Sequence, residues 1–216
     1  MDGTAFVAEL EAFQAERLAP ITAAGELSLA NDAGDPEALL KVALANEVSV
    51  SELAALWIAT TKELDVKLAL AKQAGDEARH FETVALRLAK LGFDAAAFSP
   101  PPDNALFAYL KTLPSTVERV AAGLFTLEAI AYGVNERFMA LCAARGDHET
   151  VRIYREYIQP DEQAHQRLGG RLLAKYATTP ELQAVARTTV AKVLEIAGAA
   201  RAQAAARLGT ACVPGC

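Results

Sequence analysis

The pentapeptide Asp-Glu-Ala-Arg-His at residues 76–80 returns in altered form as Asp-Glu-Gln-Ala-His at residues 161–165. In both copies a histidine follows a glutamate by three positions. Residues i and i+3 share one face of an α-helix, so the two side chains of each copy project together. A carboxylate and an imidazole on one helix face are a natural ligand pair for a borderline metal. The chain has only 3 histidines, and two of them stand in this pattern, which indicates a metal site.

The sequence around both copies predicts helices. Ala, Leu, Glu, Lys and Arg are common, and no stretch alternates apolar and polar residues as a half-buried strand does. Capping residues before a proline or a glutamate mark helix starts, and Gly92 and Gly146 mark helix ends. The expected helices lie at about 4–18, 36–61, 65–91, 115–145, 147–177 and 180–208.

The lengths of the connections predict the topology. Short links after residues 61 and 145 make each flanking helix pair an antiparallel hairpin, whereas the proline-rich link 92–114 is long enough to cross the end of a bundle. Two hairpins joined by one long crossover form the ferritin-like four-helix bundle. We therefore expect an all-α single domain, with the core bundle at 36–177, one extra helix at each end and a flexible tail at 209–216.

Hairpin geometry adds two glutamates to the proposed ligands. If the first hairpin turns near Thr61, the residue level with Glu77 lies about 15 positions before the turn, at Glu47. If the second hairpin turns near Gly146, the residue level with Glu162 lies about 17 positions before it, at Glu128. Each hairpin then supplies one lone glutamate opposite one Glu-x-x-His pair. Glu52 is the rival to Glu47, but it would lie beyond the metal level.

All four glutamates fall on the apolar stripes of their helices, which also include Ile58, Leu91, Tyr132 and Asn135. An isolated buried carboxylate is very costly, and the stripes carry no Lys or Arg at that level. Two divalent cations would neutralise the four charges. The predicted metal ligands are Glu47, Glu77, His80, Glu128, Glu162 and His165.

Residues 76–80 resemble the Asp-Glu-x-Arg-His motif of the ferritin-like di-iron carboxylate superfamily, and the resemblance covers about residues 36–177. That superfamily includes ribonucleotide reductase small subunits, bacterial multicomponent monooxygenases, fatty-acyl desaturases and aldehyde-deformylating oxygenases. The resemblance implies that Glu77 and Glu162 bridge two irons, that Glu47 and Glu128 are terminal ligands, and that each histidine binds one iron.

The resemblance also implies residues behind the ligands. Asp76 and Asp161 would orient the histidines through the second ring nitrogen, with Arg79 beside them. The second copy of the motif has Ala164 where the arginine would stand, so Arg167 or Arg155 is expected to substitute.

Three further residues have two interpretations each. Tyr132, one turn beyond Glu128, is either a redox-active or hydrogen-bonding tyrosine of the site or an ordinary core residue. Gly169, one turn after His165, leaves room for a substrate or for close helix packing. Pro160 should kink the helix or open a hydrogen bond just before Glu162.

The function implied is that of an O₂-dependent oxidoreductase with two bound iron ions, or one manganese and one iron. It would act on a small or lipophilic organic substrate and would take electrons from an external donor. Iron oxidation and storage, and a metal-free helical module for protein interactions, are the alternatives. A homodimer is expected from base rates.

Charge and composition exclude other classes. The net charge is −6 and no Lys/Arg block stands out, which disfavours nucleic-acid binding. We expect a cytoplasmic protein that does not span a membrane, because no apolar run reaches the ~18–20 residues of a membrane helix and the first residues lack a signal pattern.

The 3 cysteines are interpreted separately. Cys142 is expected to be a small core residue. Cys212 and Cys216 form a local disulfide, a pair of soft-metal ligands, or free thiols in an unstructured tail, and the last is favoured.

Overall fold

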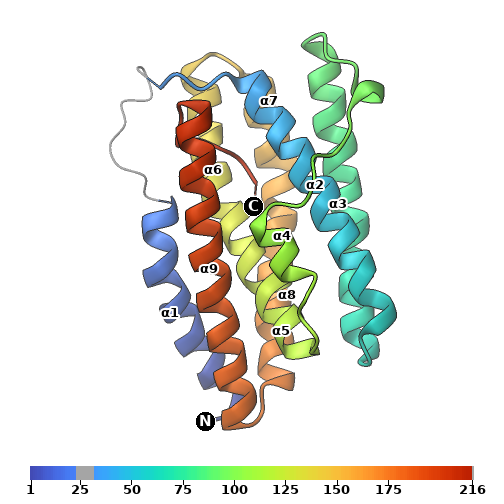
Figure 1. Ribbon diagram of the computed structural model, residues 1–216, viewed down its shortest axis with the longest axis vertical. Helices are drawn as coiled ribbons and strands as arrows, with labels where there is room; N and C mark the ends of the chain where they lie inside the picture. Colours follow the sequence, from blue (N-terminus) through green and yellow to red (C-terminus); the bar gives the residue numbers. More distant parts are fainter. Residues whose placement is uncertain (23–31, 216) are drawn as a thin grey trace.

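The computed structural model describes residues 1–22 and 32–215, and this part of the chain is helical with no strand. The long helices run side by side along one axis (Figure 1). Their bounds are α1 Gly3–Thr22, α2 Pro36–Thr60, α3 Leu64–Lys90, η2 Ala95–Ala97, α4 Ala105–Leu110, α5 Thr116–Val120, η3 Ala121–Leu127, α6 Glu128–Ala144, α7 His148–Ile153, η4 Tyr154–Ile158, α8 Gln159–Tyr176 and α9 Pro180–Leu208.

The first predicted hairpin is present as α2 and α3, which pack against each other along their length. Asp35 caps α2 by accepting a hydrogen bond from the backbone of Glu37, and Pro36 occupies the first turn, where its missing N–H costs nothing. The chain leaves α2 at Thr61 and enters α3 at Leu64, so the two helices are antiparallel neighbours.

The second predicted hairpin consists of two composite helices. α5, η3 and α6 follow one another without a gap, as do α7, η4 and α8. η3 and η4 are π-helical segments, which the sequence pattern did not predict. In η3 the Thr126 hydroxyl donates to the Ala121 carbonyl at 2.7 Å, five residues back, as the wider π-helical turn allows.

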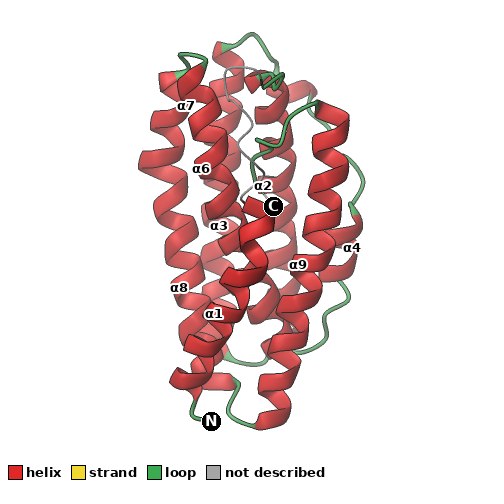
Figure 2. Cartoon of the chain, turned by 90° about the vertical axis from the view of Figure 1, so that its left-hand side faces the viewer, coloured by secondary structure: helices red, strands yellow, loops and turns green. Residues whose placement is uncertain are grey.

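The link between the hairpins, residues 91–115, contains η2 and the short helix α4, which packs against α9 and α2. Asn104 caps α4 by accepting from the backbones of Leu106 and Phe107. Figure 2 shows how α1 and α9 run beside the other long helices. Both extra helices exist, and α1 extends to Thr22, beyond its expected end.

Buried apolar side chains form two clusters, one toward each end of the long helices. One contains Trp57 and Phe125, and the other contains Leu44 and Tyr154. On α2, on α3 and on the composite helix of α7, η4 and α8, the predicted metal ligands lie between the parts of the helix that belong to these two clusters. The core is therefore divided by a buried polar layer.

Two predicted inward positions, Leu91 and Tyr132, are corrected. Leu91 follows the last residue of α3 and is 37% exposed, because the helix ends before it can be buried. Tyr132 is only half-buried, whereas Ile58, which is also half-buried, packs against the cluster that contains Trp57, as predicted. Both residues lie at the edges of their apolar stripes, where a helix face begins to turn toward solvent.

The expected flexible tail is also corrected. Residues 210–215 return to the helices, and all but the half-buried Ala211 are buried (Figure 1). Cys212 is a buried free thiol whose sulfur lies 3.6 Å from Asp32 Oδ2, and Cys142 is also free and buried. Cys216 lies outside the described residues, so its role stays a prediction.

One described helix, α2, is long and apolar enough to cross a membrane by length and composition alone. Its most apolar window has a mean hydropathy of 1.4, and 44% of that window is buried. The same helix carries the buried Glu47, and its inward face packs in both core clusters, as a core helix does.

Candidate metal centre

The structure brings together all six residues predicted as metal ligands. Glu47, Glu77, His80 and Glu162 form one group, each offering an atom within 4.8 Å of the others. A second group meets the same criterion and contains Glu77, Glu128, Glu162 and His165. Glu77 and Glu162 belong to both groups, which is the arrangement that two bridging carboxylates between two ions require.

The six proposed ligands come from four helices, α2, α3, α6 and α8. Glu47 is 5% exposed at the middle of α2, whereas its rival Glu52 is exposed. Glu77 and His80 lie on α3, Glu128 begins α6, and the remaining two lie on α8. The choice of Glu47 follows from helical periodicity, because five residues turn a helix by more than one full turn and place Glu52 on another face.

Both histidines point Nδ1 at the carboxylates. Nδ1 of His80 lies 3.2 Å from Glu77 Oε2 and 3.5 Å from Glu47 Oε2. Nδ1 of His165 lies 3.4 Å from Glu77 Oε1 and 3.5 Å from Glu128 Oε1. Nδ1 is thus the nitrogen available to a metal on both rings.

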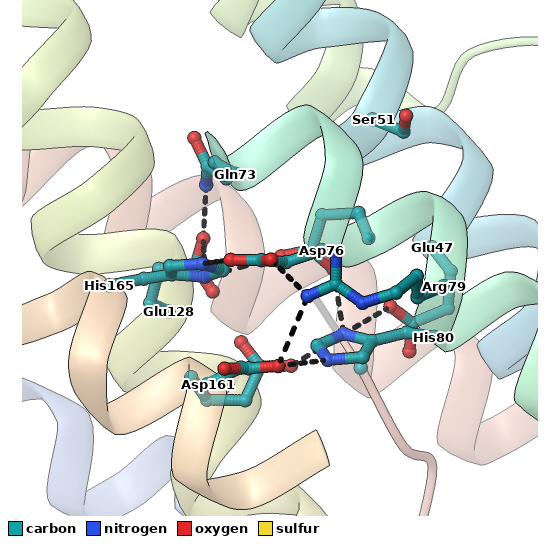
Figure 3. Close-up of polar contacts among 12 residues, drawn as sticks. Glu47, Ser51, Gln73, Asp76, Arg79, His80, Glu128, Asp161 and His165 are labelled. Carbon is teal, nitrogen blue, oxygen red and sulfur yellow. Dashed lines mark hydrogen bonds and ion pairs between the residues drawn. The ribbon is translucent and has the colours of Figure 1, made fainter. Parts of the chain in front are cut away.

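The opposite ring nitrogens meet aspartates across the two hairpins (Figure 3). Nε2 of His165, on α8, lies 2.7 Å from Asp76 Oδ2 on α3, and Nε2 of His80, on α3, lies 3.4 Å from Asp161 Oδ2 on α8. An ionised carboxylate only accepts hydrogen bonds, so Nε2 carries the proton and Nδ1 is left for a metal.

Basic side chains hold these aspartates. Arg79 is hydrogen-bonded through Nη2 to Asp76, and the same nitrogen lies 4.0 Å from Asp161 Oδ2 (Figure 3). Lys72 also pairs with Asp76. The expected substitutes do not take this place, since Arg167 bonds to Gln163 on the surface and Arg155 is exposed. One arginine reaches both aspartates because the helices bring the two together.

Gln73 was not identified from the sequence. It is 1% exposed on α3, one turn before Glu77, and its side-chain amide donates to Glu128 Oε1 (Figure 3). Its polar side chain on an apolar stripe, four residues before a proposed ligand, was the available signal. Its partner could not be foreseen because it comes from the other hairpin.

Several atoms of the cluster are buried without a hydrogen bond. Among the described residues these include Glu77 Oε1, Glu162 Oε2 and His165 Nδ1. Buried polar atoms are nearly always satisfied, and each exception costs about 1–3 kcal/mol. Three of the proposed ligand atoms thus lack the partner that a bound cation would supply, so the residues present fit a pair of metal ions.

In the absence of metal ions, some of the buried glutamates hold protons more tightly than usual. Burial, together with the charge of Glu77, raises the pKa of Glu47 to about 8 despite the opposing effect of His80. Burial and the charges of Glu128 and Glu77 raise the pKa of Glu162 well above its ordinary value. Burial alone would raise the pKa of Glu77, but its close contacts with His165 and His80 lower it below the ordinary value.

The pKa values of the two histidines are raised, although burial alone would lower them. Burial lowers the pKa of a histidine, but Glu47 and Glu77 raise that of His80 to about 11. Glu128 and Glu77 likewise raise the pKa of His165 to about 11 against the effect of burial. Two protonated imidazoles therefore offset part of the negative charge, a role that cations would take over.

The π-helical segments end where ligands begin. η3 ends at Leu127, directly before Glu128, and η4 ends at Ile158, four residues before Glu162. The disturbance predicted from Pro160 before Glu162 is present as the π-helical segment η4, which ends two residues before this proline. Gly169 serves close packing, since a Cβ there would lie 2.7 Å from the backbone of Leu124 and Phe125 in η3.

Tyr154, rather than Tyr132, is the buried tyrosine near the carboxylates. Its hydroxyl is buried without a hydrogen bond among the described residues, and its ring packs edge-on against Phe138 at 5.1 Å. Burial, followed by the charge of Glu47, raises its pKa well above the ordinary value. Tyr132 is half-buried, and its backbone carbonyl accepts from Gln159 at 3.1 Å.

These residues define a class of site, a buried cluster of carboxylates and histidines in an all-α protein that is able to hold metal ions. The chain belongs to the family described as "Protein of unknown function (DUF455)", which matches residues 36–207. The match runs from the first residue of α2 almost to the end of α9 and so includes every proposed ligand. No curated protein and no solved structure matches the chain.

Proposed function

We propose that this chain is a ferritin-like four-helix bundle that binds two iron ions and works as an O₂-dependent oxidoreductase on a small or lipophilic organic substrate. The observation that carries the proposal is the pair of ligand groups that share Glu77 and Glu162. The two antiparallel hairpins and the long link between them support the ferritin-like assignment.

The donor set supports iron. Imidazole nitrogen suits iron, zinc and copper, whereas carboxylate oxygen suits manganese, magnesium and calcium. Each group combines three carboxylates with one imidazole, a mixture that iron accepts and that also leaves room for one manganese. The residues of the two groups would hold ferrous ions, which would supply electrons for the reduction of O₂.

The chain positions the ligands and keeps water out. The Asp76–His165 contact and the Asp161–His80 contact hold both rings with Nδ1 inward, and Gln73 holds Glu128. All six ligand residues are at most 5% exposed. Burial makes the electrostatic effect of each charged ligand larger than it would be in water.

Metal content tests the site. Wild-type protein loaded with Fe(II) under anaerobic conditions should hold about two ions per chain. Glu77→Ala and His165→Ala should each lose bound metal, whereas Glu52→Ala and His148→Ala remove exposed residues of the same types and should lose none. Circular dichroism checks that all variants remain helical. Equal metal content in all five proteins contradicts the proposal.

Iron oxidation is the second candidate. It is favoured by the small size of the cavity at the carboxylates, about 10 Å³, which admits no organic molecule as the protein stands. Aerobic titration with Fe(II) separates the two functions. An iron-oxidising protein consumes many ferrous ions per chain without an organic substrate, whereas the proposed oxidoreductase stops once its own ions are oxidised and needs an external reductant to continue.

A further inference from the structure

A second, larger cavity lies beside the metal centre. It has a volume of about 620 Å³ and lies among α2, α4 and α9. Apolar side chains line much of it, among them Val42, Leu106, Ile196, Ala200 and Val213. Of the charged residues in the lining, Glu195 and Arg207 are exposed, and the half-buried Arg201 donates hydrogen bonds to backbone carbonyls of residues 213 and 215. The volume falls within the ~300–1,000 Å³ of typical small-molecule sites.

The two cavities share one wall. Asn46 lines both the large cavity and the small one at the carboxylates, and it precedes the ligand Glu47 in the chain. Val213 lines the large cavity, and Gly215, two residues later, lines the small one beside Glu128. The segment Thr210–Gly215, called the plug segment below, therefore contributes to both sides of the wall.

Side chains from three helices hold the plug segment by its backbone. Asn46 on α2 donates from Nδ2 to the Pro214 carbonyl at 3.3 Å, and the Gly215 amide donates to Asn135 Oδ1 on α6 at 3.0 Å. Arg201 on α9 donates to the carbonyls of Gly215 and Val213 at 3.1 and 2.6 Å. The plug segment itself lies outside any helix, and short irregular segments open locally more readily than helices do.

We propose that the large cavity binds the organic substrate of the metal centre, an uncharged apolar molecule, and that the plug segment moves aside to join this cavity to the metals. The proposal rests on the proposed function, because it names the substrate class and the entry route of that site. An apolar substrate fits the alanine, valine, leucine and isoleucine lining. A movable wall is required because about 10 Å³ at the carboxylates holds no more than about one water.

The plug segment can be loosened by one substitution that has a matched control. Gly215 has a φ of +72°, and a Cβ there would lie 2.6 Å from Asn46 Nδ2 and 3.1 Å from Asn46 Cβ. Gly215→Ala is therefore strained and displaces the segment from its wall. Gly146→Ala carries the same backbone strain at φ +73° with nothing within 4 Å of the new Cβ, in the turn that follows α6. Arg201→Ala loosens the plug by a different route.

Two rates report on opening. The first is the removal of Fe(II) from loaded protein by bipyridine, and the second is the alkylation of the buried Cys212 by iodoacetamide in metal-free protein, followed by peptide mass spectrometry. We expect Gly215→Ala and Arg201→Ala to raise both rates by about tenfold or more, with Gly146→Ala unchanged. Unchanged rates in both plug variants overturn the plug. Loss of helicity by circular dichroism in both plug variants also overturns it, because that result reports loosening of the whole core.

An apolar fluorescent probe tests the large cavity. 1-Aminoanthracene should bind wild-type protein at one site, and Ala200→Phe, which fills the lining, should weaken binding by about tenfold or more. Ala202→Phe adds the same ring to an exposed position of α9 outside the lining and should leave binding unchanged. Equal binding by the two variants overturns the substrate site.

The results separate this inference from the function on which it rests. The metal centre stands and the entry route is removed if wild-type protein binds two ions per chain while both plug variants keep the wild-type rates. Equal probe binding by the two cavity variants likewise removes the substrate site without affecting the metal centre. Absent metal binding removes the proposed function, whereas alkylation of Cys212 and probe binding still report on the plug segment and the cavity by themselves.

Discussion

Asp76 and His165 are separated by 89 positions in the sequence, yet Asp76 Oδ2 lies 2.7 Å from His165 Nε2. The contact joins α3 to α8, and the reverse contact joins Asp161 on α8 to His80 on α3 at 3.4 Å. Each Glu-x-x-His pair is therefore oriented by the aspartate of the other copy. The two motifs therefore depend on each other: on both histidines, Nε2 faces an aspartate and Nδ1 faces the glutamates.

Removal of the Asp76 charge should weaken metal binding. In Asp76→Asn the His165 ring loses a charged acceptor, and changes to such supporting residues typically cost 10–100-fold in metal affinity, so we expect a loss of about that size. Competition with a chelator of known affinity measures it. Asp103→Asn, which removes an exposed partner of Lys111, is the control and should have no effect. An affinity equal to wild type would show that the Asp76–His165 contact does not support the ligand.

The stability of the metal-free protein should fall as the pH rises from 6 to 9. Glu47 has a pKa of about 8 when folded against 4.5 as its ordinary value, and His80 has about 11 against 6.5. Both pKa values are raised by folding, so the stabilisation is complete below the ordinary value and is lost as the pH rises through the folded one. The lowered pKa of Glu77 acts only below this range.

Urea unfolding at pH 6 and pH 9 measures this effect, which we expect to be a few kcal/mol. Bound metal ions displace the protons, and their affinity increases with pH, so the loaded protein should lose less stability or gain some. A metal-free protein that becomes more stable between pH 6 and 9 would contradict the charge state described for the site.

Gly169→Ala should destabilise the protein. The new Cβ would lie 2.7 Å from the backbone of Leu124 and Phe125, so α8 and η3 must move apart at a cost of about 1–3 kcal/mol. Gly75→Ala, in the middle of α3 with nothing within 4 Å of its Cβ, should instead stabilise by about 0.5–1 kcal/mol. Thermal unfolding compares the two. A Gly169→Ala protein as stable as wild type would show that the close approach is not needed.

Tyr154→Phe should not destabilise the metal-free protein. The Tyr154 hydroxyl is buried without a hydrogen bond among the described residues, so its removal relieves a desolvation cost and keeps the ring packing on Phe138. In Tyr176→Phe the hydroxyl that donates to Asp65 at 2.6 Å is lost, and we expect a loss of up to about 1 kcal/mol. Urea unfolding of both variants gives the comparison. A larger loss for Tyr154→Phe would reveal a hydrogen bond of its hydroxyl.

Much of the fold was predictable because helices are encoded locally. Helical periodicity, the caps Asp35 and Ser115 and the glycines after the helices predicted the long helices to within a few residues, apart from the later end of α1. The π-helical segments were not predictable, since a single wider turn of the helix leaves the spacing of apolar residues in the sequence almost unchanged. Pro160 signalled only that a disturbance would occur, not its form.

The plug segment was missed for a different reason. Residues 210–215 have the small and proline-containing composition of a loose tail. Their burial depends on Asn46, Asn135 and Arg201, each of which comes from a different helix. No local pattern in the segment indicates these partners.

The sequence by itself determined the helices and the inward direction of the six candidate ligands, because the spacing of residues along one helix sets the face on which they lie. The tertiary structure alone decided which aspartate meets which histidine, that Gln73 meets Glu128, and that Gly215 lies against the carboxylates. Those contacts join residues on different helices, and their distances follow from how the helices pack rather than from any spacing within one of them.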